Sequence, residues 1–187
     1  RNLELKNSQI DARTVIIEAV DGKVIIDKSS IISSNGHIWY GKGIKDGFGG
    51  SYGGIGGNWD PSQAHEDPTY GDHDYVFYRE YLQDDRKLYF IGVPGNKFFS
   101  ATYGGGLVVI HTSGIDINGK ITTNGHPIDD SSVGDIKADV GSGGYILLNL
   151  TKISNDAIIY GENSAIESKG GWGVNSGNSG SGGRIVM

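Results

Sequence analysis

The sequence predicts an all-β protein, and three observations lead to that prediction. First, valine and isoleucine gather in short blocks such as Val15-Ile16-Ile17 and Val24-Ile25-Ile26, which are typical of strands because β-branched side chains pack well on a pleated surface. Second, 32 of the 187 residues are glycine, a density that disfavours helices. Third, the apolar blocks recur at a fixed spacing with glycine at their edges, which indicates stacked repeats.

The repeat is clearest where glycines precede an apolar block. Such blocks begin at Leu107, Tyr145 and Arg184, so the spacings are 38 and 39 residues. A unit of this length holds several strands of ~4–8 residues, which predicts two turns of a solenoid per unit. We expect two sets of residues to occupy equivalent positions on neighbouring strands: Leu107, Tyr145 and Arg184, and Ile110, Leu148 and Met187.

A second signature follows these blocks: an isoleucine, two small or polar residues, Asn or Lys, and then glycine. It occupies residues 32–36, 121–125 and 166–170. Its Asn-Gly dipeptides, like Asp21-Gly22 and Asn118-Gly119, are turn formers because they accept a positive φ. The signature therefore predicts a turn at the same point of each repeat.

The predicted architecture is a parallel β-helix (a β-solenoid), with a β-sandwich as the alternative. One coil cannot bury its own apolar strand faces, but coils stacked ~4.8 Å apart pair their backbone amides and align like side chains. A sandwich explains the strands but not their spacing. Alternation also places four residues on one face of a strand: Ile115, Ile117, Gly119 and Ile121.

Residues 1–187 are predicted to form one solenoid segment with an insertion at 37–103. The insertion holds all five phenylalanines and most of the tyrosines, and a glycine-rich stretch lies at 47–59. Exposing so many aromatic side chains to water is unfavourable. We therefore expect the insertion to cover one solenoid face as a flap. The last residues, 184–187, read as the opening of a strand, which predicts that the segment belongs to a longer chain.

The glycine stretch 49–57, the glycine-led strands and the Ile-x-x-Asn-Gly turns resemble a known type of protein. They are similar to the very large glycine-rich repeat proteins of protist and algal cell surfaces, whose repeats are thought to fold as pectin-lyase-like β-helices. The resemblance runs from about residue 14 to residue 187. It implies an extracellular structural or adhesive role in a surface coat or appendage, and it brings no catalytic residues with it.

Composition excludes several classes of function. The net charge of −6 argues against nucleic acid, because its binders need a positive face for phosphates. No apolar run approaches the ~20 residues of a transmembrane helix. The chain has no cysteine, which removes disulfides, thiolate zinc sites and thiol catalysis. The glycine stretch is followed by no Gly-Lys-Ser/Thr, so nucleotide binding is rejected and no cofactor is implied.

The insertion supplies most of the candidate site residues. Flat aromatic rings suit sugar rings or a protein partner, although packing over the solenoid is the favoured interpretation of the same residues. The candidates for such contact are Trp39, Tyr40, Phe48, Tyr52 and Trp59. Two carboxylate pairs, Asp84-Asp85 and Asp129-Asp130, are interpreted as solvated loop charges, because adjacent strand residues point to opposite faces.

Two further candidates concern metal and glycosylation. Asp72, His73 and Asp74 put oxygen and imidazole ligands in one loop, but their spacing matches no named metal site, so no bound metal is predicted. Asn149-Leu150-Thr151 is an N-glycosylation acceptor if the chain is secreted, provided that Asn149 faces outward from its strand.

The sequence thus favours a non-enzymatic structural protein of the extracellular space or cell surface. Its predicted partners are its own further repeats or identical subunits, joined through open strand edges, together with glycans. Two alternatives stay open. One is a polysaccharide-binding or polysaccharide-cleaving β-helix protein, and the other is a calcium-dependent adhesin, which would lose stability in chelator.

Overall fold

The fold is all-β. The computed structural model describes residues 1–37, 103–126, 140–152, 157–172 and 180–187, which form strands and turns without a helix. Their strands are β1 (Leu3–Leu5), β2 (Gln9–Asp11), β3 (Thr14–Ile26), β4 (Ile31–Ser33), β5 (Leu107–Ile117), β6 (Lys120–Thr122), β7 (Tyr145–Leu150), β8 (Ile158–Tyr160), β9 (Ala165–Glu167) and β10 (Arg184–Val186).

The strands form two sheets, and every strand pairing among the described residues is parallel. Sheet A has the order β1-β3-β5-β7-β10, with β8 also paired to β5, and sheet B has the order β2-β4-β6-β9. The chain passes from one sheet to the other after each strand, except between β7 and β8. A parallel pair needs a crossover connection. Here the passage through the other sheet supplies it.

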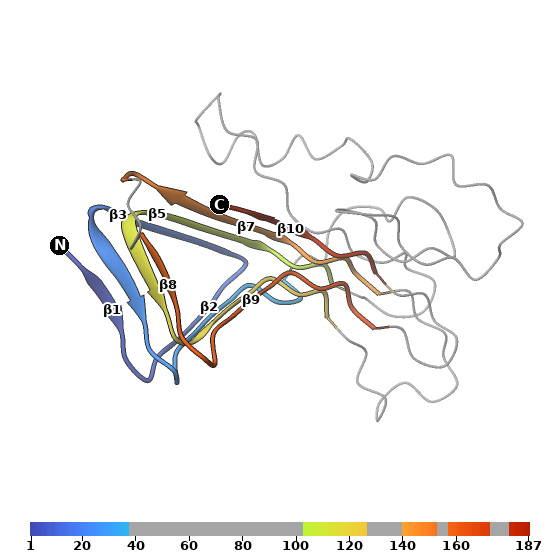
Figure 1. Ribbon diagram of the computed structural model, residues 1–187. Helices are drawn as coiled ribbons and strands as arrows, with labels where there is room; N and C mark the ends of the chain where they lie inside the picture. Colours follow the sequence, from blue (N-terminus) through green and yellow to red (C-terminus); the bar gives the residue numbers. More distant parts are fainter. Residues whose placement is uncertain (38–102, 127–139, 153–156, 173–179) are drawn as a thin grey trace, which may run out of the picture.

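Sheet A is bent, so its two arms and sheet B bound a triangular section (Figure 1). The first arm contains Thr14–Ala19 of β3 and the strands β7 and β10, and the second arm contains Lys23–Ile26 with β1 and β8. β5 runs through both arms. The bend lies where the register of β3 and β5 shifts, between Ala19 and Lys23.

The register confirms the alignment expected from the repeat. Leu107 pairs with Tyr145, and Tyr145 pairs with Arg184. Ile110 pairs with Leu148, and Met187 directly follows β10. The isoleucines that begin the second signature are also neighbours in sheet B, in the order Ile32, Ile121 and Ile166.

The number of turns expected per repeat is wrong. Because Leu107 and Tyr145 are direct neighbours, one unit carries the chain once around both sheets and not twice. The strands of sheet B have only 3 residues each, so the rest of a unit goes into its corners and connections.

The single strand face expected for Ile115, Ile117, Gly119 and Ile121 is also wrong. Ile115 and Ile117 lie on β5 of sheet A, whereas Ile121 lies on β6 of sheet B. The chain turns between the two sheets at residues 118–119, as the Asn-Gly dipeptide predicts. All three isoleucines are nevertheless fully buried, because both sheets face one shared core.

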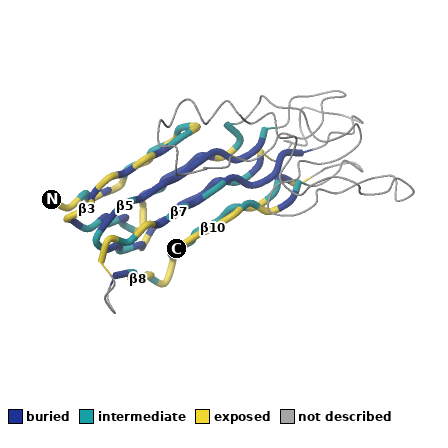
Figure 2. The backbone as a smooth tube through the Cα atoms, turned by 90° about the horizontal axis from the view of Figure 1, so that it is seen from above, coloured by how far each residue is buried: buried dark blue, intermediate teal, exposed yellow. Residues whose placement is uncertain are grey.

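The core fills the space between the three sides, and the buried residues run along β5 and β7 in Figure 2. Each fully buried aliphatic side chain stabilises the fold by about 1.5–3 kcal/mol. The fully buried members of this cluster are Val24, Ile26, Ile32, Val108, Ile110, Ile115, Ile117, Ile121, Ile146 and Leu148.

Candidate functional site

Sheet B and the first arm of sheet A meet at a glycine-rich corner (Figure 1). The described chain stops here after His37, His126 and Trp172, and it resumes at residues 103, 140 and 180. Residues 38–102, 127–139 and 173–179 therefore all connect to the two sheets at this one corner. We call it the glycine corner, and it comprises residues 34–36, 104–106, 123–125, 141–144, 168–171 and 180–183.

Backbone hydrogen bonds join the two sheets at the glycine corner in each repeat. The amide of Gly106 donates to the Ser34 carbonyl at 2.7 Å, that of Gly144 to Thr123 at 2.6 Å and that of Gly183 to Ser168 at 2.7 Å. Such close approach leaves no room for a side chain. A Cβ on Gly144 would overlap the carbonyl oxygen of Gly106. Glycine is therefore required immediately before β5, β7 and β10, at Gly106, Gly144 and Gly183, because a Cβ at each would overlap a backbone carbonyl of the neighbouring chain segment in the stack.

Asparagine side chains continue the ladder of sheet B around the corner. The Asn35 Oδ1 accepts the backbone amide of Asn124 at 2.6 Å, and the Asn124 Oδ1 accepts the backbone amide of Lys169 at 2.7 Å. Each asparagine thus satisfies an amide of the next strand, where the backbone leaves the regular sheet. This contact explains the Asn of the repeat signature.

In the third copy of the signature, Lys169 occupies the position of the asparagine, and its side chain forms an ion pair. Its ammonium lies 2.8 Å from a carboxylate oxygen of Glu167, and the Asn124 amide lies 3.5 Å from the other oxygen. The hydrogen bond from Lys169 holds the pKa of the Glu167 carboxyl below its ordinary value. The Lys169 side chain is largely exposed and that of Glu167 partly so, and we therefore expect the pair to add at most about 1 kcal/mol to stability.

Imidazole and aromatic side chains surround the points where the chain leaves the glycine corner. The His37 Nε2 lies 2.9 Å from the Asp11 carboxylate, and the rings of Tyr103 and His126 meet edge to face at 6.1 Å. Trp172 is 77 % exposed. The edge of the glycine corner therefore carries polar and aromatic side chains, which are residue types that commonly line a binding surface.

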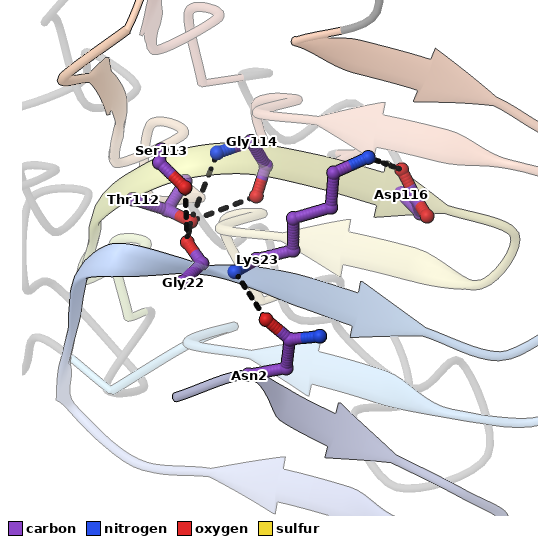
Figure 3. A network of polar contacts seen from close by, with 7 residues as sticks. All are labelled: Asn2, Gly22, Lys23, Thr112, Ser113, Gly114 and Asp116. Carbon is purple, nitrogen blue, oxygen red and sulfur yellow. Dashed lines mark hydrogen bonds and ion pairs between the residues drawn. The ribbon is translucent and has the colours of Figure 1, made fainter.

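A second polar network lies at the bend of sheet A, where three residues of β3 face one of β5 (Figure 3). The fully buried Thr112 hydroxyl lies 2.8 Å from the Gly22 carbonyl and 2.7 Å from that of Gly114, and Ser113 also donates to Gly22. The Lys23 ammonium lies 3.9 Å from Asp116. The Thr112 and Ser113 hydroxyls thus bond to backbone carbonyls at the bend, which is a structural role.

Asn149 faces outward on β7, as its interpretation as a glycosylation acceptor requires. Its amide donates to the Nδ1 of His111 at 2.9 Å, because an amide nitrogen can only donate. The hydroxyl of Thr151, the third residue of the acceptor motif, donates to the Val20 carbonyl at 2.8 Å. Glycosylation of Asn149 stays a prediction.

The other predicted site residues fall outside the described residues. They are the aromatic residues Trp39, Tyr40, Phe48, Tyr52 and Trp59, the weak metal candidates Asp72, His73 and Asp74, and the carboxylate pairs Asp84-Asp85 and Asp129-Asp130. The flap predicted for residues 37–103 lies almost wholly outside them too. Within the described ranges, no three metal-ligating side chains come together.

Sequence reasoning missed two features of the site: the contact of His37 with Asp11 and the side-chain ladder of the asparagines. The recurrence of Asn35 and Asn124 at the same position of the signature was the signal for the ladder, since residues in register can bond side chain to backbone. The short strand that carries Asp11 gives no periodic signal, so its contact with His37 could not be anticipated.

No protein-family model, curated protein or solved structure matches the chain. Across the part of the chain that the structure describes, no helix is long and apolar enough to span a bilayer.

Proposed function

We propose that the chain is a non-enzymatic structural protein, built as a segment of a parallel β-helix that contributes to an extracellular layer, appendage or filament. The observation that carries the proposal is the register of the two sheets. Equivalent residues of successive repeats lie side by side in both sheets, and the chain alternates between the sheets as it advances. Stacked coils of this kind can be extended without changing the cross-section.

The direction of the strands supports a β-helix over a β-sandwich. Sandwiches are built from antiparallel strands joined by hairpins and Greek-key connections. Here all the described pairings are parallel, and each connection within sheet A, apart from that from β7 to β8, passes through sheet B. The triangular section in Figure 1 supports the same choice, because its three sides face one continuous core.

The use of the polar side chains supports a structural role. Asn35 and Asn124 bond backbone amides, and Thr112 and Ser113 bond backbone carbonyls. These contacts hold the corners and the bend in place. Side chains committed to the backbone in this way are not available for proton transfer or nucleophilic attack.

The glycine corner favours binding as a second candidate function. Three connecting segments leave the same corner of a rigid scaffold, an arrangement that commonly carries recognition. The longest of them, 38–102, contains the five aromatic residues proposed for contact with glycans or a protein partner. A polysaccharide would be held there by stacking on these rings. The polysaccharide-cleaving and calcium-dependent alternatives have no comparable support from the described residues.

Labelling of intact source cells tests the extracellular structural role. An antibody against the chain should stain the cells without permeabilisation, and the antigen should stay with the surface fraction after detergent extraction of membranes. Staining that appears only after permeabilisation would overturn the proposal. Binding of the chain to a glycan array, lost on replacement of Trp39 and Trp59 by alanine, would favour the second candidate.

A further inference from the structure

One asparagine of the chain meets the sequence requirement for an N-linked glycan. Among the 12 asparagines of the chain, only Asn149 begins an Asn-x-Ser/Thr motif, which Leu150 and Thr151 complete. The structure describes all three residues: Asn149 and Leu150 end β7, and Thr151 follows the strand. A single substitution can therefore remove every N-linked acceptor from the molecule.

The alternation of side chains along β7 places the motif on the outer face of sheet A. Ile146 and Leu148 belong to the buried core cluster, and Leu150 packs against it. Because successive side chains of a strand point to opposite faces, Asn149 points away from the core. Thr151, two residues further along, is exposed as well. A bulky glycan on Asn149 would therefore extend into solvent without displacing a core side chain.

The hydrogen bond of the Asn149 side chain is compatible with a glycan. Its amide nitrogen donates to the Nδ1 of His111, the residue paired with Asn149 on β5, at 2.9 Å. An asparagine amide has two hydrogens and a glycan replaces one of them, so one hydrogen is left for this bond. The first sugar would then be attached to a side chain that its neighbour on the next strand already orients.

We propose that Asn149 carries an N-linked glycan, transferred to its side-chain nitrogen before β7 pairs with β5. This inference rests on the proposed function, since a protein of the cell surface passes through the secretory compartments in which such glycans are attached. The donor is a lipid-linked oligosaccharide diphosphate. A bond forms between the Asn149 Nδ2 and the anomeric carbon of the sugar, and the bond from that carbon to the diphosphate oxygen breaks. The lipid diphosphate leaves with the electron pair, and the amide releases one proton.

The order of transfer and folding follows from the bonds that the motif makes in the folded chain. The Asn149 amide is bonded to His111, and the Thr151 hydroxyl donates to the Val20 carbonyl at 2.8 Å. The backbone amide of Thr151 also donates to the Thr112 carbonyl at 2.8 Å. A transferase that recognises the motif through its amide and its hydroxyl needs both groups in an accessible, extended segment. Folding engages both groups, so the acceptor is open only while β7 is unpaired.

Mass spectrometry of the protein from its source cells tests the proposal directly. The peptide that contains Asn149 is analysed with and without peptide N-glycosidase, an enzyme that converts a glycosylated asparagine to aspartate. Treatment in water labelled with heavy oxygen distinguishes this conversion from spontaneous deamidation. Most copies of the peptide should carry a glycan before treatment and a labelled aspartate after it. Recovery of the peptide mainly with an unmodified Asn149 would overturn the proposal.

Expression through the secretory pathway of a eukaryotic host adds matched controls. The unaltered chain and Thr151→Ser, which keeps a hydroxyl in the motif, should both lose apparent mass on treatment with the glycosidase. Asn149→Gln and Thr151→Ala should not change. Thr151→Ala also loses the bond to the Val20 carbonyl, whereas Asn149→Gln keeps it, so the circular dichroism spectrum of Asn149→Gln should stay that of the unaltered chain. A mass change that persists in Asn149→Gln, or none in the unaltered chain, would contradict the assignment.

The proposed order is tested with chain made in bacteria, which carries no such glycan. Ile146→Asp places a charge in the closed core and should keep the chain unfolded, while the acceptor motif stays intact. Given a transferase and a lipid-linked donor, Ile146→Asp should accept the glycan at least tenfold faster than the folded, unaltered chain. Equal rates would show that the folded motif is still open to the enzyme and would overturn the order.

The result for Asn149 can be separated from the result for the cellular role. Surface labelling of source cells together with an unmodified Asn149 would reject the glycan and leave the structural role in place. Labelling only after permeabilisation would reject the role. In that case, transfer in the eukaryotic host would still show whether the motif is an acceptor.

Discussion

The middle of the stack and its C-terminal end place the same kinds of residue in opposite environments. Ile146 on β7 and Ile185 on β10 are register partners, so their side chains lie on the same side of sheet A. Ile146 is fully buried, whereas Ile185 is 40 % exposed. The difference shows that a strand of this fold is protected by the strands on both its sides. A position in the repeat becomes a core position only when the next rung is present.

The largest effect should come from truncating this matched pair. Ile146→Ala should lower the free energy of unfolding by about 2–5 kcal/mol, because it leaves a cavity in a closed core. Ile185→Ala should cost less than about 1 kcal/mol in the monomer, since its side chain is partly in water. Urea denaturation at low protein concentration measures both. Equal losses would contradict the comparison, and a loss for Ile185→Ala that grows with concentration would indicate that another copy covers it.

Glycine substitutions at equivalent corner positions should give the next largest difference. A Cβ on Gly143 would lie 2.5 Å from the Ser168 oxygen and 2.6 Å from the Gly183 nitrogen, whereas one on Gly182 meets nothing closer than 3.7 Å. Gly143→Ala should therefore destabilise the chain by about 1–3 kcal/mol or more, and Gly182→Ala by only a few tenths. The melting temperatures of the two variants, compared with that of the unaltered chain, measure this difference. A large loss for Gly182→Ala would show that its surroundings are tighter than described.

The asparagine ladder offers a smaller test of the same contrast. Asn124→Ala removes the acceptor of the Lys169 amide and should cost about 1 kcal/mol. Lys169→Ala, at the open end of the ladder, removes an exposed ion pair and should cost less than about 0.5 kcal/mol. Amide hydrogen exchange adds a local measurement, in which the Lys169 amide should lose protection in Asn124→Ala. Unchanged protection would mean that the side-chain bond is not formed in solution.

The smallest effect concerns pH at the turn that follows β3. Hydrogen bonds, foremost from the Ser30 hydroxyl and then from the Asn7 amide, lower the pKa of Asp27 from 3.8 to about 2. Its ionised form is favoured in the folded chain, so this stabilisation is complete above pH ~4 and is lost as the pH falls towards 2. Denaturation curves between pH 5 and pH 2 should therefore show that the free energy of unfolding falls less in acid for Asp27→Asn than for the unaltered chain. Parallel curves would contradict this assignment.

The repeat made much of the sheet register predictable from the sequence. The spacing of Leu107, Tyr145 and Arg184 indicated which residues pair in sheet A. The recurring isoleucines at 32, 121 and 166 indicated which residues pair in sheet B. Both succeed for one physical reason. Parallel strands in register bring the same residue types of each repeat side by side, so the recurring motif is visible in the chain even in sheet B, where its interval changes from 89 residues (32 to 121) to 45 residues (121 to 166).

Other features lay beyond the reach of the pattern. The strands β1, β2 and β8 have 3 residues each, too few for alternation to be recognised. Their places are set by pairing with distant strands, as when Leu3 pairs with Val24. The prediction of two turns per repeat was wrong for a related reason. The sequence does not show how many residues of a repeat lie in strands and how many lie in corners and connections. The predicted contact residues of segment 38–102 stay predictions.

The glycine corner has a consequence for how the molecule can vary. The segments attached there range from the 7 residues of 173–179 to the 65 residues of 38–102, while the strands on either side keep their register. The entropic cost of joining the ends of a segment grows only with the logarithm of its length, so this difference amounts to about 2 kcal/mol. New sequence can therefore be inserted at this corner, by evolution or by grafting an epitope, with little cost to the scaffold. An insertion within β5 next to Thr112 would instead disrupt the buried network at the bend, in which the Thr112 hydroxyl lies 2.8 Å from the Gly22 carbonyl.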